Sequence, residues 1–261
     1  MAAPDILDLS TVSTPSFGLA DELAPHTGDW HRHRRHQLLY ASAGSLYLEV
    51  AGQSWMLPPQ RAAWIHGGTE HRVVVKQSAS LRTVYLAPEL AQGPPGCRVF
   101  VVSSLAREML LAATRWGPAQ EAGRAAGCFF TAIGALCSEW AGHAADFRLP
   151  RARSSELARA MRETLGRLSD PGLTAPSVAR AAGMSARTMA RRFQQEAGMS
   201  WRSYTHRARM LRAMELLAVP DATVTDTCYQ LGFRSLGTFS AAFHSFVGES
   251  PSAFRSQLQA R

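Results

Sequence analysis

The chain has 261 residues, of which 28 are basic, 20 are acidic and 46% are hydrophobic, so it is long enough for two domains with sizeable cores. It contains no run of about eighteen apolar residues and no basic start followed by an apolar stretch, and we therefore expect a cytoplasmic protein without a membrane span or a signal peptide. The four cysteines show no C-x-x-C spacing, which favours buried thiols in a reducing compartment over a structural zinc site.

Charge is distributed unevenly along the chain. Residues 151–261 contain sixteen arginines and eight acidic residues, a net charge of +8, whereas residues 1–150 contain twelve basic and twelve acidic residues, a net charge of zero. The whole excess therefore belongs to the C-terminal part. This asymmetry suits a domain that neutralises nucleic-acid phosphates, joined to a domain that does not touch nucleic acid.

The N-terminal half is predicted to be a β-domain. Three prolines interrupt residues 1–30, where we expect a loose lead-in with a single strand. From Gln37 to about Leu86, short β-type segments alternate with turn residues, and these segments lie at 38–41, 45–50, 54–57, 62–65, 72–75 and 81–86. Six strands at a spacing of about eight to twelve residues indicate a small sandwich or barrel.

Histidines gather at two places in this β-region. His31 and His33 are followed by Gln37, and the run Gly67-Gly68-Thr69-Glu70-His71 opens a later strand. In an extended strand, residues two apart point to the same side, as two ligands of one ion must. The arrangement resembles the cupin double motif, in which such residues bind a metal inside the barrel. By this resemblance the metal ligands are His31, His33, Gln37 and His71.

The resemblance to the cupin motif is incomplete. Gln37 replaces a glutamate, His66 a proline and Val75 an asparagine, and Pro25 stands where a glycine belongs. Three interpretations stay open. The cluster binds a divalent transition metal (Zn, Ni, Co, Mn or Fe); or some of the histidines line a metal-free effector pocket with Trp55 and Trp64; or the stretch from His31 to His36 is a solvated basic run.

Two helices are predicted after the β-region. Apolar residues stripe the first helix at Leu105, Met109, Leu110 and Trp116, and the second at Phe129, Ile133, Leu136, Cys137 and Trp140. Both stripes pack on the barrel, and part of one stripe is a candidate dimer seam. Residues 146–154 are the predicted linker, which separates a domain of residues 1–145 from a domain of residues 155–261.

The second domain contains one pattern twice. A helix striped by Leu157, Met161, Leu165 and Leu168 opens the domain, and a long helix is predicted over 201–218. Around the long helix, two sets of residues match each other at a spacing of fifty: Phe193, Gly198, Ser200 and Tyr204, then Phe243, Gly248, Ser250 and Phe254. Turn glycines at Gly183 and Gly232 precede the two sets. The repeat indicates two copies of one helix-turn-helix unit.

These paired motifs resemble the DNA-binding domain of the AraC/XylS family of bacterial transcription regulators. The resemblance covers about residues 155–255 and rests on residues of both copies: Gly183-Met184-Ser185, Met189, Arg191, Gly198-Met199-Ser200 and Arg209, then Gly232-Phe233, Ser235, Phe239-Ser240, Ser250-Pro251 and Phe254-Arg255. It implies binding to double-stranded promoter DNA, contact with RNA polymerase if the protein is an activator, a homodimer, and a small-molecule or metal effector bound by the N-terminal domain.

The first recognition helix is expected over 186–196. Met189 and Phe193 face its core, and the opposite face then carries Arg187, Thr188, Arg191 and Gln195. The two arginines lie one helical turn apart, so both can reach base edges or phosphates in one major groove. By resemblance, the base-reading residues of the family occupy these positions. The alternative is a solvated basic face.

The second recognition helix departs from the family pattern. Its outward positions are Leu236, Gly237, Thr238 and Ala241, where the resemblance often implies Gln or Ser at the first two and Arg at the fourth. This unit either reads thymine methyl groups or DNA shape, or positions the protein through the DNA backbone, or is degraded. Arg234 and His244 are candidates for phosphate contacts.

The sequence thus predicts an α+β protein of two domains: a cupin-like β-barrel with two following helices, then an all-α domain with two helix-turn-helix units. The leading hypothesis for its function is a sequence-specific DNA-binding regulator, controlled by an effector in the barrel and without enzymatic activity. The alternative is a metal-dependent cupin oxygenase or isomerase with a helical C-terminal domain. The absence of an acidic residue at the cupin ligand position disfavours the enzyme.

Overall fold

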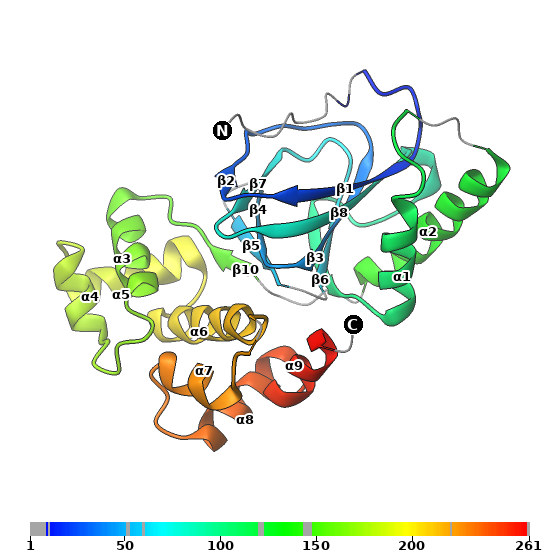
Figure 1. Ribbon diagram of the computed structural model, residues 1–261. Coiled ribbons are helices and arrows are strands. Elements are labelled where there is room, and N and C mark those ends of the chain that lie inside the picture. Colours follow the sequence, from blue (N-terminus) through cyan, green and yellow to red (C-terminus); the bar gives the residue numbers. More distant parts are fainter. Residues whose placement is uncertain are drawn as a thin grey trace. The chain divides into compact units, whose positions relative to one another are not determined.

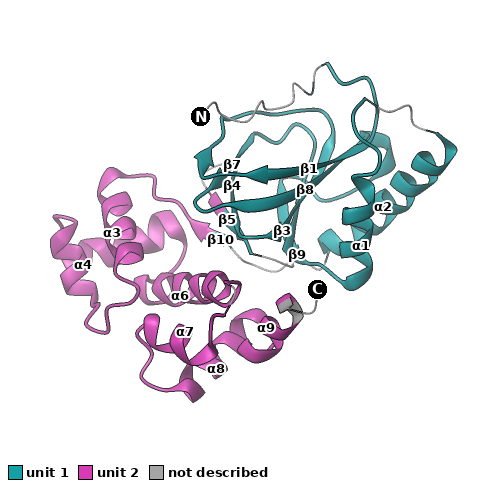
Figure 2. Cartoon of the chain, viewed as in Figure 1, with its two compact units in different colours: residues 1–51, 55–148 teal, residues 52–54, 149–261 magenta. Residues whose placement is uncertain are grey.

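The computed structural model describes residues 9, 11–50, 53–58, 61–119, 123–142, 148–219 and 221–259. The chain divides into two compact units, shown in teal and magenta in Figure 2. Unit 1 comprises residues 1–51 and 55–148, and unit 2 comprises residues 52–54 and 149–261. The linker predicted at 146–154 begins outside the described residues, because 146 and 147 are not among them.

The described part of unit 1 consists of two β-sheets followed by the helices α1 and α2 (Figure 1). Its strands are β1 (Phe17–Leu23), β2 (His26–Thr27), β3 (His36–Ala43), β4 (Leu46–Val50), β5 (Gln53–Leu57, of which 55–57 belong to unit 1), β6 (Arg61–Ile65), β7 (His71–Val75), β8 (Ala79–Leu86) and β9 (Cys97–Val101). One sheet has the order β1-β8-β3-β6-β9, and the other contains β5-β4-β7-β2. The six predicted strands are confirmed as β3 to β8, and the single strand expected within residues 1–30 is confirmed as β1, while β2 and β9 were not predicted. A 3₁₀ turn, η1 (Pro88–Leu90), precedes β9, and a short strand, β10 (Arg148–Pro150), ends at the domain boundary.

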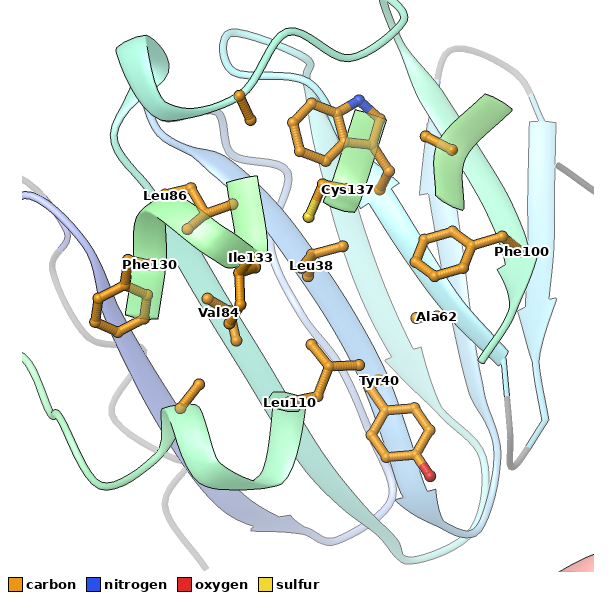
Figure 3. Close-up of a cluster of buried hydrophobic side chains, with 14 of the residues drawn as sticks. Leu38, Tyr40, Ala62, Val84, Leu86, Phe100, Leu110, Phe130, Ile133 and Cys137 are labelled. Carbon is orange, nitrogen blue, oxygen red and sulfur yellow. The ribbon is translucent and has the colours of Figure 1, made fainter. Parts of the chain in front are cut away.

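The main core of unit 1 lies between the first sheet and the helices α1 (Ser104–Ala113) and α2 (Arg124–Gly142). Figure 3 shows side chains of the strands meeting those of the helices, among them Leu38, Tyr40, Val84, Leu86, Leu110, Phe130 and Ile133. Alternate residues of a strand point to opposite faces of its sheet. The other face of β3 and β8, which carries Gln37, Leu39, Thr83 and Tyr85, is therefore turned away from the helices.

The predicted helical stripes need two corrections. Leu105 is 59% exposed, and Ala106 is buried in its place, because α1 begins at Ser104 with Ser103 as its cap and buries positions 106, 110 and 113. In α2, Phe130 is buried, whereas Phe129 is only partly buried. Three of the cysteines are buried as expected, but Cys128 is exposed on α2.

Unit 2 is helical. Its elements are α3 (Ser155–Gly166), α4 (Ala175–Ala181), α5 (Ala186–Arg192), the π-helical segment η2 (Phe193–Ala197), α6 (Trp201–Leu217), α7 (Val224–Gln230), α8 (Leu236–Val247) and α9 (Pro251–Gln259). The helix predicted at the start of this domain is confirmed as α3. Its predicted apolar stripe needs one change, because Leu165 is 41% exposed and Thr164 is buried in its place. The long helix predicted over 201–218 is confirmed as α6. Among the described residues, no helix is both long and apolar enough to cross a membrane.

The sequence repeat corresponds to a structural repeat of the pairs α4–α5 and α7–α8. The turn glycines Gly183 and Gly232 have φ of 74° and 73°, a region that glycine enters without steric cost. Each following helix is capped by a serine, Ser185 in α5 and Ser235 in α8. Equivalent aromatic residues fill the two cores: Phe193 with Tyr204, and Phe243 with Phe254.

Glu196 connects the end of the first helix-turn-helix unit to the start of α3. Its carboxylate accepts hydrogen bonds from the Arg153 and Ser154 backbone N–H groups at 2.9 and 2.8 Å and from the Ser154 hydroxyl at 2.7 Å. It also pairs with Arg192 at 3.3 Å. Burial alone would raise the pKa of Glu196, but the hydrogen bonds from Ser154 and Arg153 outweigh it and hold the pKa below its ordinary value.

The Glu196→Ala variant is expected to lose about 1–3 kcal/mol of unfolding free energy, because it leaves several donors without an acceptor. Since the folded-state pKa is lowered, this stabilisation is present above the ordinary pKa and disappears as the pH falls through the folded value. Urea unfolding at pH 7 and at acid pH measures both effects. Glu163→Ala is the control, because it removes a helix-surface ion pair to Arg167 that is worth about 0.3–0.5 kcal/mol. Equal losses in the two variants would contradict the expectation.

Candidate functional site

The four predicted metal ligands lie together in unit 1. A β-bridge joins His31 to His71, with reciprocal backbone hydrogen bonds of 3.0 and 2.9 Å. One ring nitrogen from each of His31, His33 and His71 lies within 4.8 Å of those of the other two. Gln37, from the inner face of β3, places its Oε1 atom 3.2 Å from His33 Nε2 and 3.0 Å from His71 Nε2.

Each of the three histidines is oriented by a backbone carbonyl at its Nδ1 atom. These contacts are His31 to Asp29 O at 3.0 Å, His33 to Arg35 O at 2.8 Å and His71 to Thr69 O at 2.8 Å. A carbonyl oxygen only accepts hydrogen bonds, so Nδ1 carries the proton in each ring. A neutral imidazole then has its lone pair on Nε2, which is how histidines are held when Nε2 binds a metal.

The orientation of the Gln37 amide is set by its other contacts. Its Nε2 atom lies 3.0 Å from Thr83 Oγ1 and 3.3 Å from Tyr85 Oη. The Thr83 hydroxyl donates to the Leu38 carbonyl at 3.0 Å, so it accepts from Gln37. Oε1 is therefore the atom that faces the histidines. Two imidazole lone pairs and an amide oxygen, all acceptors, converge at about hydrogen-bond distance, an arrangement that a cation between them would stabilise.

Protonation of one of the histidines would also supply a positive charge, but burial disfavours it. Desolvation lowers the pKa of His71 to about 4, and it lowers the pKa of His33 below its ordinary value. Both rings therefore stay neutral near pH 7. Imidazole nitrogens with an amide oxygen are ligands for Zn, Ni, Co, Mn or Fe(II), so the residues present fit one divalent ion of this group.

A cavity of about 930 Å³ adjoins the cluster and is lined by residues 9–39 and 73–85 of unit 1. His31, His33 and Gln37 form part of its wall, together with Thr83 and Tyr85, which were not predicted from the sequence. Tyr85 pairs with Gln37 in the register of β3 and β8, so its side chain lies on the same face of the sheet as that of Gln37. Thr83 is two residues from Tyr85 along β8 and shares this face, so alternation along the strand could have identified both residues. Arg35 also lines the cavity, and its guanidinium donates to four carbonyls of the preceding segment: Leu9, Val12, Thr14 and Pro15.

The prediction that Trp55 and Trp64 line the effector pocket is wrong for this cavity. Trp64 is 0% exposed and belongs to the core under the helices, because it pairs in register with Leu38 and so shares its face of the sheet. Trp55 is buried and is not part of the cavity wall. His36 also faces away from the cluster, with its ring 4.7 Å from that of Trp64.

The first recognition helix presents the predicted residues as α5 and η2. Arg187, Arg191 and Gln195 are exposed, and Thr188 is half-buried, with its hydroxyl 2.9 Å from the Ser185 cap. The extent of the predicted helix is right, but its last turn is π-helical, which changes the angular position of Gln195 relative to an α-helix. The neighbouring Arg192 has a structural role, because it pairs with Glu156 and Glu196.

The second recognition helix, α8, presents an apolar and small surface. Leu236 is 40% exposed, and Gly237, Thr238 and Ala241 are exposed, as is Arg234 before the helix. Thr238 Oγ1 lies 2.8 Å from the Ser235 cap, as Thr188 does from Ser185 in the first unit. The two units thus share their backbone framework and differ in the side chains that they expose.

Comparison with known proteins assigns both units. A family described as "AraC-like ligand binding domain" matches residues 15–95, and one described as "Helix-turn-helix domain" matches residues 178–257. The transcriptional regulator NimR of Escherichia coli K12 is 29% identical over 239 residues, which are 91% of this chain and 85% of NimR. The chain belongs to the AraC family of transcription regulators. It therefore has a DNA-binding domain and a ligand-binding domain.

Two further matches cover a smaller part of this chain. The activator NphR of Rhodococcus sp. is 35% identical over 105 residues, which are 40% of this chain and 31% of NphR. A solved structure of the AdpA DNA-binding domain in complex with a target DNA is 31% identical, covers 41% of this chain and 96% of that chain, and has a TM-score of 0.39.

Proposed function

We propose that the effector site of this AraC-family regulator is the cavity of unit 1, with one divalent transition metal held by His31, His33 and His71. The Oε1 atom of Gln37 is the fourth donor. The observation that carries this proposal is the convergence of unprotonated Nε2 atoms on an acceptor oxygen, at 3.0 and 3.2 Å. When bound, the ion would supply a Lewis acid that holds an effector.

The cavity serves as a sensor and not as an active site. The relatives NimR and NphR are named as transcriptional regulators. Among the described residues of the cavity wall, Asp21 is the one acidic side chain, and it pairs in register with Leu81, four residues along β8 from Tyr85. The described part of the cavity wall therefore places no carboxylate beside the cluster as a general base. The rival, a metal-dependent oxygenase or isomerase, is tested by turnover of candidate substrates by metal-loaded protein.

In unit 2, Arg187 and Arg191 read bases, and Arg234 contacts a phosphate. Thr188 and Gln195 support the first unit, while Leu236, Gly237, Thr238 and Ala241 place α8 against the groove with little side-chain readout. Several relatives are named as activators, so contact with RNA polymerase is part of the proposal. A homodimer that uses the exposed face of α1 or α2 is a further part of it.

Selection of bound duplexes from a random pool tests this function. Cobalt-loaded protein is expected to enrich one sequence, and removal of the metal by a chelator is expected to change the affinity for that sequence about fivefold or more. An unchanged affinity would contradict a sensory role of the metal. Failure to enrich any sequence would contradict specific readout and would leave an architectural DNA-binding protein.

Binding should depend steeply on salt, because the net charge of +8 lies within residues 151–261. The slope of log K against log salt concentration is expected to be about −0.9 for each phosphate that the protein neutralises. Titrations at several salt concentrations on the selected duplex measure this slope. A slope near zero would contradict an interface based on phosphate contacts.

A further inference from the structure

The donors of the proposed metal site carry no negative charge. Three neutral imidazoles and an amide leave both charges of a divalent ion uncompensated. The cavity wall adds further positive charge through Arg32, Arg34 and Arg35, against the single carboxylate of Asp21. An uncompensated ion in a partly buried site favours an anion as its next ligand.

The ion would be reached from the cavity side. His31 and His33 are partly exposed and line the cavity, whereas His71 is 0% exposed and does not line it. A ligand in the cavity can therefore place one group beside the Nε2 atoms of His31 and His33. The head of the ligand belongs at this end of the cavity.

The cavity becomes apolar along the strands that lead away from the cluster. On β3, Gln37 is followed on the same face by Leu39, and on β8, Tyr85 and Thr83 are followed by Leu81. Other apolar wall residues are Leu19, Leu23 and Val73. Four residues of strand span about 13 Å at ~3.3 Å per residue, so the apolar section accommodates an extended body of roughly that length.

Asp21 discriminates between ligands with one and two charges. Its register partner is Leu81, at the apolar section. An anionic group at the far end of a ligand would approach this carboxylate and be repelled by it. The wall thus disfavours a dianion that carries a charge at each end.

We propose that the effector is a monoanion with an apolar body, whose anionic head binds the metal and whose body lies along β3 and β8 toward Leu39 and Leu81. This proposal rests on the metal site proposed above. The anionic head of the effector then binds the metal, its apolar body contacts Leu39 and Leu81, and Asp21 repels a second negative charge.

Visible absorption of the cobalt(II)-loaded full-length protein tests the proposal, because this spectrum changes when a new ligand binds the ion. Octanoate is expected to change the spectrum and 1-octanol to leave it unchanged. Acetate is expected to require roughly a hundredfold higher concentration or more, since it lacks the methylene groups whose burial stabilises bound octanoate. Suberate, with a carboxylate at each end, is expected to bind at least about tenfold more weakly than octanoate.

Two variants identify the wall residues. Asp21→Asn is expected to strengthen suberate binding severalfold and to leave octanoate nearly unchanged. Its matched control is Glu22→Gln, because Glu22 is the neighbouring acid on β1 and contacts Ser80 and Arg82 instead of the cavity. Leu81→Gln is expected to weaken octanoate about tenfold and to leave acetate unchanged. A Leu81→Gln protein that binds both as tightly as the parent would contradict the assigned path of the body.

The possible failures are distinguishable. If cobalt binds in a one-to-one ratio but octanoate changes neither the spectrum nor the heat of mixing, the ligand class is wrong and the metal site stands. Octanoate binding of equal strength with and without cobalt would overturn the role of the metal in recognition. If cobalt does not bind, the metal site itself is overturned, and this proposal with it.

Discussion

The His71→Ala protein is expected to lose stoichiometric metal binding, with an affinity lower by at least about a hundredfold. Loss of an outer hydrogen-bond partner alone typically costs about 10- to 100-fold, and His71 supplies a ligand atom itself. Its ring is 0% exposed and lies 4.3 Å from that of His31 and 5.2 Å from that of His33. Elemental analysis of protein purified without an affinity tag, followed by titration with cobalt(II), measures the loss.

His26→Ala is the matched control for this variant. His26 lines the same cavity, but its Nδ1 atom contacts Ala24 O at 2.8 Å and its ring is not part of the three-histidine group. Its removal is expected to leave metal binding unchanged. Equal metal content in the parent and in both variants would show that the ion, if any, binds elsewhere.

Gln37→Glu gives a change in the opposite direction. A carboxylate of the same length would compensate one charge of the ion, so the variant is expected to bind metal more tightly than the parent. If Gln37 Oε1 did not face the ion, the substitution would bury a carboxylate against Thr83 and Tyr85, and the free energy of unfolding would fall without any gain in metal affinity. The pair of measurements therefore reports on the orientation of the amide.

The sequence predicted the strands of the barrel better than the faces of their side chains. Turn residues between β3 and β8 mark where each strand ends, so the number and order of these strands followed from local chemistry. The face of the sheet on which Trp64 lies could not be predicted in this way, because all five residues of β6 are buried and the strand shows no alternation of polar and apolar residues. Only its pairing with Leu38, a property of the sheet register, places Trp64 under the helices.

The histidine cluster and the recognition helix α5 could be predicted from the sequence to different extents. The extended strand expected at His31 and His33 is not formed, because His31 makes only an isolated β-bridge and His33 lies outside the strands. Their convergence with His71 depended on the cupin resemblance, since a contact across the chain has no local signal. In α5, helical period separated Arg191 from the core residue Met189. The helical period could not show that Arg192 forms an ion pair with Glu156, because the two residues lie far apart in the chain. The period also does not predict the π-helical turn at the end of the helix.

Arg187→Ala and Arg191→Ala are each expected to weaken binding to the selected duplex by about 1–3 kcal/mol. Both side chains are exposed on α5, one helical turn apart. Binding to a scrambled duplex should fall less, because non-specific binding depends on the total positive charge. Fluorescence anisotropy titrations on the two duplexes measure the difference, and Leu236→Ala and Ala241→Ser are expected to have smaller effects than either arginine variant.

Arg162→Ala is the control for general charge, because Arg162 is an exposed arginine on α3, outside both helix-turn-helix pairs. It is expected to reduce binding to both duplexes equally and only slightly. The conservative variant Arg191→Lys separates base reading from phosphate contact, since lysine keeps the charge but lacks the planar pair of donors that matches guanine. If Arg191 reads a base, lysine restores binding to the scrambled duplex and not to the selected one. Restoration on both duplexes would assign Arg191 to a phosphate, and sequence preference would then have to come from Arg187 or from DNA shape.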